Sequence, residues 1–560
     1  MKSYKKVLPL GISFMLATQT LYAEPAVPPT PPPGNITSGA QLQRDLEMLE
    51  RYRVGQQIQD DIQTRKAKNV VDKTRKTQEK TLKEVNVTVT KINYNKSKVF
   101  SDNIISDIVK DYVNRQVSIG DLYNMVERIN DLYTYAGYIT CKAFLPQQEV
   151  KNGVIRILLV EGYIGNINIL GNKTTKEGYI IRRWRDLKGK VATLKKINDK
   201  VIKFNGTNDI QLKLMLQAGE KSGTTDFLLT AYEPQRFTHT LFADNLGGYS
   251  NSPYRYGYFL NARSLSGMRD NLSMGYTRTL GSNSFNANYE FPLGPSGAKF
   301  SVGYSTNATE IVKGSIAEEG TKIKGHSTAY TAALRQPWIV NKTTRSEVGL
   351  EFSNQTSKTT FEGMHWADDQ VRDLVTYFSH TGYGDSHVYY QKLSFTPVGS
   401  YRNITGTLNE NNIRHFNYTG YYQKTYASEQ LLVARFDAQY NVNEYLPSLR
   451  HFYVGGGNSV RGYRESFLSG ERGWSASVEY QLPKEMKVLK HSPFVFFDYG
   501  HVGGASALES HFLKGTGVGL KGSITKNLYS SFTFAFPLVH HVSGEEVGRT
   551  RIHYTLSFSF

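Results

Sequence analysis

The C-terminal end of the chain alternates strictly between apolar and polar residues. The apolar positions are Ile552, Tyr554, Leu556, Phe558 and Phe560, and the polar positions between them are His553, Thr555, Ser557 and Ser559. A period of two predicts a β-strand, because successive side chains of a strand point to opposite faces. We expect one face of this strand to contact an apolar phase and the other face to contact water.

Short alternating segments of this kind recur throughout residues 236–560, separated by turns rich in Gly, Asn and Ser. Residues 432–442 and 474–482 show the pattern clearly. Such segments are typical of an outer-membrane β-barrel, whose closure leaves no unpaired strand edge in the hydrocarbon. A soluble β-sandwich would also alternate. Residues 236–560 are long enough for a transmembrane antiparallel barrel of roughly sixteen strands.

The region before the barrel contains the order strand–helix–helix–strand–strand twice. The first copy, residues 82–161, begins with an alternating strand over residues 85–94, and the second copy spans residues 162–235. Two copies of one supersecondary unit predict two small α/β domains in tandem. The junction at residues 160–162 leaves almost no linker, so we expect the pair to be fairly rigid.

Four segments precede these domains. Residues 1–23 have the lysines, apolar stretch and Leu-Tyr-Ala site of a secretory signal peptide, with an amphipathic helix as the alternative. Residues 24–40 are rich in proline and should be extended. Residues 41–64 carry apolar side chains at steps of three and four among many charges, which predicts a weakly amphipathic helix. Residues 65–81 form a charged linker.

The composition restricts both the kind of membrane protein that this chain can be and the kind of partner that it can bind. The 560-residue chain has no apolar run of the ~18 residues that a membrane-spanning helix needs, so a helical membrane protein is excluded. Its formal net charge of +18 makes nucleic acid a candidate binding partner. No zinc-ligand cluster, helix-turn-helix pattern or arginine-rich arm accompanies that charge, so we expect no nucleic acid. Scattered basic residues suit anionic lipid headgroups, an acidic client or solvated loops.

Little in the chain resembles a catalytic or metal site. The sequence has no H-E-x-x-H, P-loop or G-x-S-x-G motif, and His540 and His541 lie beside a turn. Carboxylate pairs at 318–319, 368–369 and 545–546 occur in polar contexts, where solvated charge is the simpler interpretation. The lone Cys141 permits no intramolecular disulfide and is expected to be a buried free thiol. We therefore expect no enzyme, no cofactor and no metal.

The most specific signal lies between residues 451 and 500. Residues 451–465 read HFYVGGGNSVRGYRE, where the glycines indicate a loop with unusual backbone angles or close approaches. Residues 493–500 read PFVFFDYG, a strand with one apolar face. Its other face carries Phe496, Asp498 and Gly500, so Asp498 should point into the lumen, where an arginine can reach it.

These residues resemble the superfamily of outer-membrane insertases and two-partner-secretion transporters. Val460, Arg461, Gly462 and Tyr463 match the VRGY signature of its sixth extracellular loop, and residues 496–500 look like its F-x-D-x-G strand motif. The tandem α/β domains resemble polypeptide-transport-associated (POTRA) domains. The arrangement of a helix, a linker and then two POTRA-like domains resembles that of the TpsB transporters of hemolysin, hemagglutinin and contact-dependent-inhibition systems. Five would instead resemble the BamA insertase.

The resemblance implies an ion pair in the lumen. In this superfamily the loop folds back into the barrel and its arginine pairs with the strand aspartate, which here means Arg461 with Asp498. Gly462 would permit the tight tip, and Gly500 would leave room for it. Without the resemblance, both charges could be ordinary solvated groups. The terminal aromatic, Phe560, would close the barrel and be presented for its assembly.

The resemblance also implies a function. The protein would recognise a large TpsA-type exoprotein in the periplasm and secrete it unfolded through its barrel without ATP. The POTRA-like domains would bind the client at strand edges, and the helix at 41–64 would occupy the lumen at rest. Outer-membrane lipids, periplasmic chaperones and the barrel assembly machinery are the other expected partners. Two alternatives remain, an insertion and assembly factor or a passive porin-like channel, and the exoprotein's identity is open.

Overall fold

A computed structural model describes residues 37–66, 70–72, 85–221, 223–403, 409–411, 413–442, 445–483, 491–504, 511–542 and 544–560. The predicted signal peptide, residues 24–36 of the proline-rich segment and most of the charged linker lie outside the described residues. The chain divides into two compact units. One comprises Thr64–Pro234, and the other comprises Met1–Gln63 with Gln235–Phe560.

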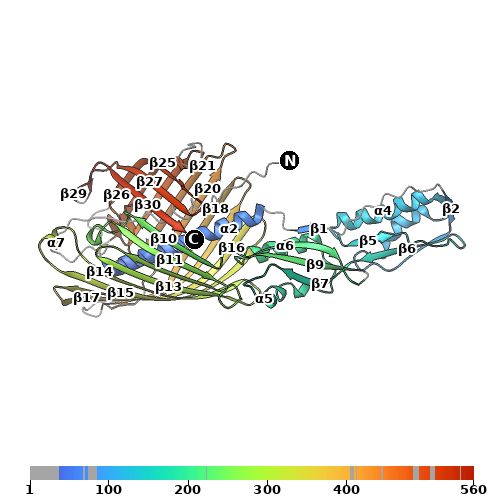
Figure 1. Ribbon diagram of the computed structural model, residues 1–560, viewed down its shortest axis with the longest axis horizontal. Coiled ribbons are helices and arrows are strands. Elements are labelled where there is room, and N and C mark those ends of the chain that lie inside the picture. The colour runs from blue at the N-terminus through green and yellow to red at the C-terminus, as the bar shows by residue number, and fades with distance from the viewer. Residues whose placement is uncertain are drawn as a thin grey trace. The chain divides into compact units, whose positions relative to one another are not determined.

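The C-terminal unit is a closed antiparallel barrel of sixteen strands, which confirms the predicted fold class (Figure 1). In order these are β10 (Phe237–Asp244), β11 (Arg255–Arg263), β12 (Asn271–Arg278), β13 (Ser282–Leu293), β14 (Ala298–Glu310), β15 (Ile323–Val340), β16 (Thr344–Phe361), β17 (Met364–Tyr383), β18 (His387–Asn403), β20 (His415–Thr425), β21 (Leu431–Asn441), β24 (Arg472–Gln481), β25 (His491–Gly503), β26 (His511–Ser523), β27 (Leu528–Pro537) and β30 (Arg551–Ser559). The short β19 (Asn409–Asn411) adds to the end of β18. The barrel closes where β30 pairs with β10.

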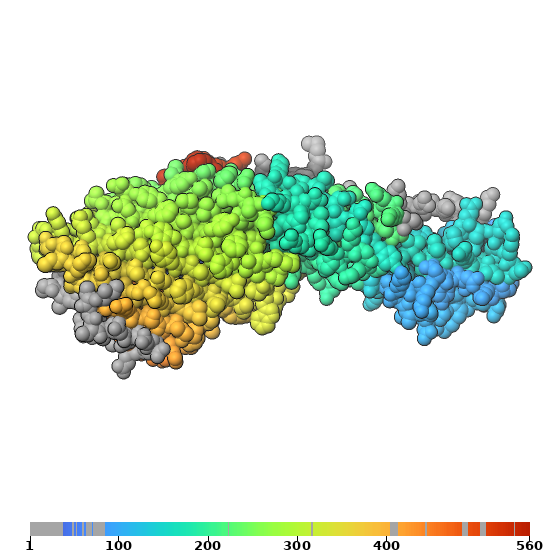
Figure 2. Space-filling model, turned by 90° about the horizontal axis from the view of Figure 1, so that it is seen from below, coloured from blue at the N-terminus to red at the C-terminus, as the bar shows by residue number. Residues whose placement is uncertain are grey.

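The two faces of each strand differ as the alternation predicts. On β30, the apolar Ile552, Leu556 and Phe558 are exposed on the outer surface, while His553 and Thr555 are buried. Figure 2 shows this outer wall over the green and yellow strands as a continuous packed surface. One expectation was wrong for β30: its polar face does not meet open water, because other parts of the chain cover it inside the barrel.

The main filling element is the helix α2 (Ser38–Lys66), which runs inside the barrel (Figure 1). It is somewhat longer than the predicted 41–64. Thr37 begins it, since its side-chain Oγ1 accepts the Ala40 N–H at 3.2 Å, as an N-cap does. No helix among the described residues is long and apolar enough to cross a membrane.

Short elements decorate the barrel loops. They are η4 (Tyr249–Asn251), α7 (Ser315–Glu318), η5 (Ser448–Arg450), β22 (Phe452–Val454), β23 (Leu468–Gly470), β28 (His541–Val542) and β29 (Glu545–Glu546). β22 pairs with β23, so the loop between them is the end of a hairpin. This hairpin connects β21 to β24.

The other unit contains two domains of the same plan. The first has β2 (Asn86–Val89), β3 (Lys91–Tyr94), α3 (Asp102–Val109), η2 (Lys110–Tyr112), β4 (Arg115–Ser118), α4 (Ile119–Tyr135), β5 (Cys141–Phe144) and β6 (Val154–Glu161). The second has β7 (Tyr163–Leu170), α5 (Glu177–Ile181), η3 (Arg185–Leu187), α6 (Leu194–Asn205), β8 (Gln211–Ala218) and β9 (Thr224–Tyr232). Their sheets have the orders β3-β6-β5 and β7-β9-β8, and β1 (Val70–Asp72) joins the second sheet beside β8.

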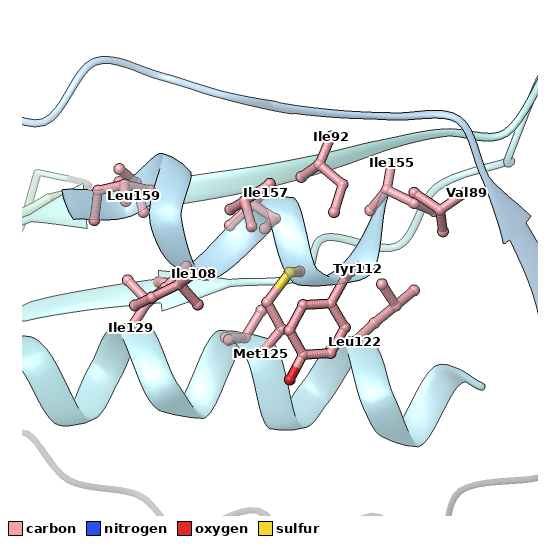
Figure 3. Close-up of a cluster of buried hydrophobic side chains, with 14 of the residues drawn as sticks. Val89, Ile92, Ile108, Tyr112, Leu122, Met125, Ile129, Ile155, Ile157 and Leu159 are labelled. Atoms are coloured by element: carbon pink, nitrogen blue, oxygen red, sulfur yellow. The ribbon is translucent and has the colours of Figure 1, made fainter. Parts of the chain in front are cut away.

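The first domain packs one apolar face of α4 on its sheet (Figure 3). Leu122, Met125 and Ile129 follow the three- and four-residue spacing of a helix and lie against Ile155 and Ile157 of β6. The prediction of one strand over residues 85–94 was wrong. The chain is interrupted at Thr90, where Gly153 O accepts the N–H at 2.8 Å, and β2 pairs with β4 while β3 pairs with β6.

A buried carboxylate at the junction fixes the end of the first domain. Glu161, the last residue of β6, accepts the Tyr133 hydroxyl at 2.9 Å and the Lys98 N–H at 2.7 Å. At Gly162, a Cβ would come within 2.5 Å of Thr140 O, so only glycine fits without a shift. The connection is short and its backbone is packed.

Candidate functional site

The glycine-rich loop lies inside the barrel against its own wall. Val460 and Tyr463 are fully buried and pack with Val502 of β25 and Leu513 of β26. The Tyr463 hydroxyl lies 2.8 Å from Lys514 O and accepts the Val539 N–H at 3.0 Å. Apolar packing and these hydrogen bonds fix the loop tip in one place.

The structure brings Arg461 of this loop onto Asp498 of β25. Arg461 Nε donates to Asp498 Oδ2 at 2.8 Å, and its Nη2 donates to Oδ1 at 2.9 Å. The Arg461 backbone N–H also donates to Oδ2, at 3.0 Å. Both side chains are buried. A planar guanidinium facing a carboxylate with two parallel hydrogen bonds is the strongest geometry for such a pair.

The pair belongs to a larger buried network. Arg461 Nη1 donates to Glu479 of β24 at 2.8 Å, and Glu479 in turn pairs with Lys521 of β26. The guanidinium carbon also lies 3.5 Å from the centre of the Phe496 ring, a cation–π contact. Two cations and two anions therefore balance inside the barrel wall, which reduces the cost of burying each.

Glycines make this approach possible. Gly462 has φ of +100°, and a Cβ there would lie 2.8 Å from Pro537 N. At Gly500, a Cβ would lie 2.5 Å from a methyl carbon of Val454 and 2.9 Å from one of Val460. At Gly515 on β26, a Cβ would collide with the carbonyl oxygen of Arg461. The loop therefore lies against wall positions that are occupied by glycine and have no side chain.

Two of the carboxylate pairs interpreted above as solvated charge, at 368–369 and 545–546, contain a residue that contacts another side chain instead. Glu545 pairs with Arg464 of the loop at 3.2 Å, with both side chains about three-quarters buried. Asp369 accepts the Tyr401 hydroxyl at 2.7 Å. Within the described ranges, no group of three or more His, Cys, Asp or Glu residues could hold a metal ion.

The polar contacts of α2 are distributed along its length. Near its start, Ser38 Oγ lies 2.7 Å from Ser327 Oγ, and Asp45 accepts the Ser284 hydroxyl at 2.9 Å. Arg44 reaches the glycine-rich loop, where Nη1 donates to Ser466 Oγ at 3.1 Å. The helix therefore contacts both the barrel wall and the loop that carries Arg461.

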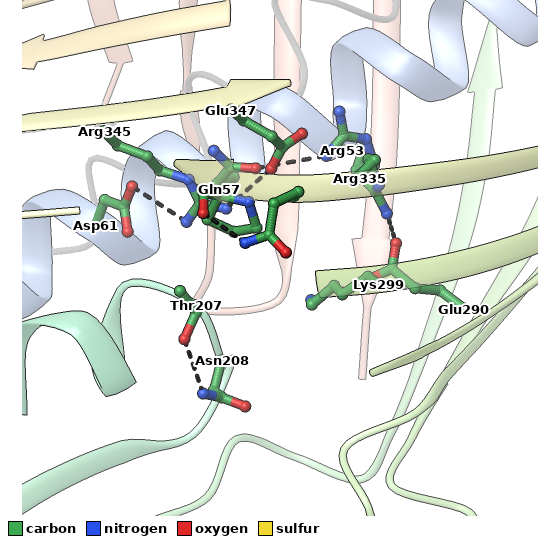
Figure 4. Close-up of polar contacts among 12 residues, drawn as sticks. Arg53, Gln57, Asp61, Thr207, Asn208, Glu290, Lys299, Arg335, Arg345 and Glu347 are labelled. Carbon is green, nitrogen blue, oxygen red and sulfur yellow. Dashed lines mark hydrogen bonds and ion pairs between the residues drawn. The ribbon is translucent and has the colours of Figure 1, made fainter. Parts of the chain in front are cut away.

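Ion pairs hold the middle and the end of α2. Glu50 pairs with Lys392 of β18 at 3.0 Å, and Arg51 pairs with Asp437 of β21 at 3.3 Å. Asp61 lies 3.7 Å from Arg345 of β16, which also pairs with Glu347 (Figure 4). These contacts link α2 to three different strands of the wall.

One apolar contact and one cavity complete the lumen. Ile58 of α2 is buried among Val388, Tyr390 and Tyr421 of the wall. A cavity of about 560 Å³ remains beside the helix, lined by residues of α2, the loop and many barrel strands. The lumen is thus closed by packing at one level of the helix and open beside it at others.

Comparison with known proteins decides the family. The family described as haemolysin secretion/activation protein ShlB/FhaC/HecB matches residues 223–522, and the POTRA domain of ShlB type matches residues 87–162. The chain belongs to the ShlB/FhaC/HecB family. It is an outer-membrane transporter of the two-partner secretion type, with its POTRA domains in the periplasm.

Relatives of the ShlB/FhaC/HecB chain support this assignment. It is 24% identical over 436 residues to the heme/hemopexin transporter protein HuxB of Haemophilus influenzae, which covers 72% of this chain and 74% of that one. It is 22% identical over 470 residues to the outer membrane transporter CdiB-2 of Burkholderia pseudomallei, covering 78% and 77%. The solved structure of CdiB from Escherichia coli has the same fold, with a TM-score of 0.66, 18% identity and coverage of 93% and 98%.

The sequence alone did not predict the whole buried network around Arg461. The alternation over residues 474–482 places Ser477 and Glu479 on one face of a strand but does not predict their pairing with the loop. In the structure Ser477 lies directly opposite Asp498 on the neighbouring strand and donates its hydroxyl to Oδ1 at 2.7 Å. The sequence did not mark Lys521 as part of this network, because an isolated lysine in an alternating strand resembles any other charged residue that faces the lumen.

The terminal Phe560 lies at the seam. Its N–H donates to His239 O at 2.9 Å, the His239 N–H donates back to Phe560 O at 2.9 Å, and the two rings stack at 5.2 Å. Phe560 thus extends the pairing of β30 with β10 by one position.

Proposed function

We propose that this transporter carries one large TpsA-type exoprotein, unfolded, from the periplasm to the cell surface through its own barrel. The observation that supports this best is the content of the lumen. A barrel of sixteen strands is wide enough for an aqueous channel. Here that channel holds α2, which several separate polar contacts attach to the wall and to the glycine-rich loop.

The resting state is closed by α2, and transport begins when the helix leaves. Its contacts at Glu50, Arg51 and Asp61 are ion pairs with three different strands, β18, β21 and β16. The Glu50 and Arg51 pairs are partly exposed, and such pairs have a small net free energy because the charges recover hydration on separation. The Asp61–Arg345 pair is buried, so its separation costs more. The helix can therefore be displaced stepwise by another chain without unfolding the barrel.

The client is recognised by the periplasmic domains and drives its own passage. Strand edges in these domains bind an extended chain through backbone hydrogen bonds, which requires little of its sequence. Folding of the exoprotein outside the cell prevents its return. The cycle needs no ATP, catalytic residue, cofactor or metal. Lipids surround the apolar wall, and periplasmic chaperones and the barrel assembly machinery deliver and insert the chain.

The Arg461 network has a positioning role in this cycle. It holds the glycine-rich loop against β24, β25 and β26, and the same loop contacts α2 through Ser466 and Arg44. A misplaced loop would occupy the path of the client or release the helix. We therefore assign Arg461 and Asp498 to the shape of the channel.

Co-expression with a partner exoprotein tests the function. The transporter is produced with a candidate TpsA-type exoprotein, and the exoprotein is measured at the cell surface while porin levels are followed as a control. Surface exoprotein with unchanged porins is the expected result. Reduced porins on deletion of the transporter would instead indicate an insertion and assembly factor.

Conductance tests the plug. A variant lacking residues 24–64 should open a large, steady channel in planar bilayers, whereas the full-length chain should be mostly closed. An unchanged closed state in the variant would contradict the role of α2. A passive porin would conduct equally with and without the helix.

A further inference from the structure

Two arginines lie on long strands of the barrel wall, β17 with 20 residues and β18 with 17. The chain enters the barrel from the periplasmic POTRA domains at the first residue of β10, so β10 runs toward the cell surface. Because neighbouring strands are antiparallel, β16 and β18 also run toward the surface and β17 runs back. Met364 is therefore the surface end of β17, and Tyr383 is its periplasmic end.

Both arginines point away from the lumen. Arg372 of β17 and Arg402 of β18 are exposed. Their neighbours Asp373 and Tyr401 are buried, and Asp373 pairs with Arg450 inside the barrel. Successive side chains of a strand point to opposite faces, so the two guanidinium groups lie on the outer surface of the wall.

The height of Arg372 matches the outer boundary of the hydrocarbon. Eleven residues separate it from Tyr383 at the periplasmic end of β17. A rise of ~3.3 Å per residue along a strand tilted by ~45° places it about 25 Å above that end. The apolar band of an outer-membrane barrel is also ~25 Å tall. Arg372 therefore lies at the level of the headgroups of the outer leaflet.

An apolar row lies directly below the arginines. Phe352, Leu374 and Val398 are register partners on β16, β17 and β18. Phe352 and Val398 are 45% and 61% exposed on the outer surface. Arg372 occupies the next outward position of β17 toward the cell surface, two residues from Leu374. The wall thus combines an apolar surface that suits acyl chains with positive charge immediately above it.

The two cations are close to each other. Arg372 is the register partner of Ser400, and Arg402 lies two residues farther along the same face of β18. The Cα atoms of such diagonal neighbours are ~7–8 Å apart, within reach of long side chains. Like charges at this spacing repel each other, and an anion held between them would reverse the sign of the interaction.

No carboxylate of the described ranges pairs with either arginine. Arg372 Nε lies 3.4 Å from Asn354 Oδ1, a long contact to a neutral group. The nearby Asp368 lies 3.9 Å from both Lys358 and His365 instead. Both guanidinium groups therefore keep donors available for an external anion.

Other strands carry different residues near their surface ends. The outward side chains there include Tyr256 of β11, Tyr440 of β21 and Phe536 of β27, which are 54%, 60% and 41% exposed. Tyrosine suits a membrane–water interface but supplies no positive charge. The arginine pair is thus a local feature of β17 and β18, and not part of a charged belt around the whole barrel.

We propose that Arg372 and Arg402 bind a phosphate of a glycolipid in the outer leaflet of the outer membrane. The lipid is of the lipid A class, an acylated glucosamine disaccharide that carries phosphates. The two guanidinium groups hold one phosphate by charge-assisted hydrogen bonds, for which their planar donors are well suited. The acyl chains lie along the apolar row on β16, β17 and β18. This site does not depend on the transport of an exoprotein.

Native mass spectrometry of the purified full-length chain in detergent tests the site. The probes are lipid A with two phosphates and the same lipid with both phosphates removed. The combined variant Arg372→Gln and Arg402→Gln should bind the phosphorylated lipid roughly thirtyfold more weakly than wild type, the effect of two basic residues at an anionic lipid surface. Its affinity for the dephosphorylated lipid should equal that of wild type.

Two further variants serve as controls. Lys195→Gln with Lys196→Gln removes two exposed charges from the second POTRA domain, and this variant should bind the phosphorylated lipid as wild type does. Arg372→Lys with Arg402→Lys keeps the charge but loses the planar donors, so its affinity should be intermediate. The heat-dependent gel shift confirms that each barrel is folded.

Several results would overturn the proposal. Equal affinity of wild type for the two lipids would show that the apolar wall alone binds them. An equal loss of affinity in the Lys195 and Lys196 control would assign the effect to net charge. Complete displacement of the lipid by millimolar inorganic phosphate would indicate a site for a free anion. If the glutamine variant does not fold, the wild-type preference between the two lipids and the affinity of the arginine-to-lysine variant decide the question.

Discussion

At the scale of single residues, Arg461 is the centre of the buried network. We expect Arg461→Ala to lower secretion strongly, because it leaves Asp498 buried with no cation, only the Ser477 hydroxyl and the backbone N–H of residue 461, and the loop loses its side-chain anchor. Removing one partner of a buried pair costs about 3–5 kcal/mol. The barrel should still assemble, since its strand pairing is intact. Surface exoprotein and the heat-dependent gel shift of the barrel measure the two effects.

A matched control lies three residues further along the loop. Arg464 also pairs with a carboxylate, Glu545, but each of these side chains keeps about a quarter of its surface exposed, whereas Arg461 and Asp498 are buried. Arg464→Ala should therefore change secretion and heat resistance less than Arg461→Ala, because both partners of the Arg464 pair can regain water on separation. Full secretion by both Arg461→Ala and Asp498→Asn would show that the network has no role in transport.

Cys141 allows a test of packing in the first POTRA domain. The thiol is buried, and this burial raises its pKa to about 11. A raised pKa leaves the thiol protonated at pH 8, with about one molecule in a thousand as the reactive thiolate. We expect almost no reaction with a maleimide in the folded protein and complete reaction in urea. Rapid labelling of the native chain would show that this core is open.

At the scale of elements, the attachment of α2 can be loosened by one charge. Lys392→Glu places a carboxylate against Glu50, where the structure has an ion pair. Repulsion should favour release of the helix, so open events in planar bilayers should become several-fold more frequent. Lys324→Glu is the control, since it removes an exposed pair with Glu310 on the barrel wall. Equal opening frequencies in the two variants would count against α2 as the gate.

The elements also show what could be predicted from sequence. Alternation assigned the faces of β25 and β30 correctly, because a period of two depends only on neighbouring residues. The network around Arg461 depends on strand register, which places Ser477 beside Asp498 and cannot be seen along one strand. β1 has three residues in a charged linker, and only the edge of β8 makes it a strand. The resemblance of the VRGY and F-x-D-x-G motifs supplied the pairing that periodicity could not.

At the scale of the whole molecule, the central question is whether the client passes through the lumen or through an opened wall. The seam between β10 and β30 pairs five positions from Thr240 to Asp244 and is extended by His239 with Phe560, while β10 and β11 pair eight positions. A short seam is the weakest place in the wall. A route through the lumen does not need it to open, because α2 alone would have to leave.

A disulfide across the seam distinguishes these routes. Thr240 and Ser559 are register partners whose hydroxyl oxygens lie 2.9 Å apart, so Thr240→Cys with Ser559→Cys can form a bond across β10 and β30. We expect the oxidised variant to secrete the exoprotein at the rate of its reduced form, because the barrel keeps its full diameter. Oxidation must be complete by mass spectrometry, and the single-cysteine variants are the controls. Secretion that stops on oxidation and resumes on reduction would place the route, or a step that gates it, at the seam.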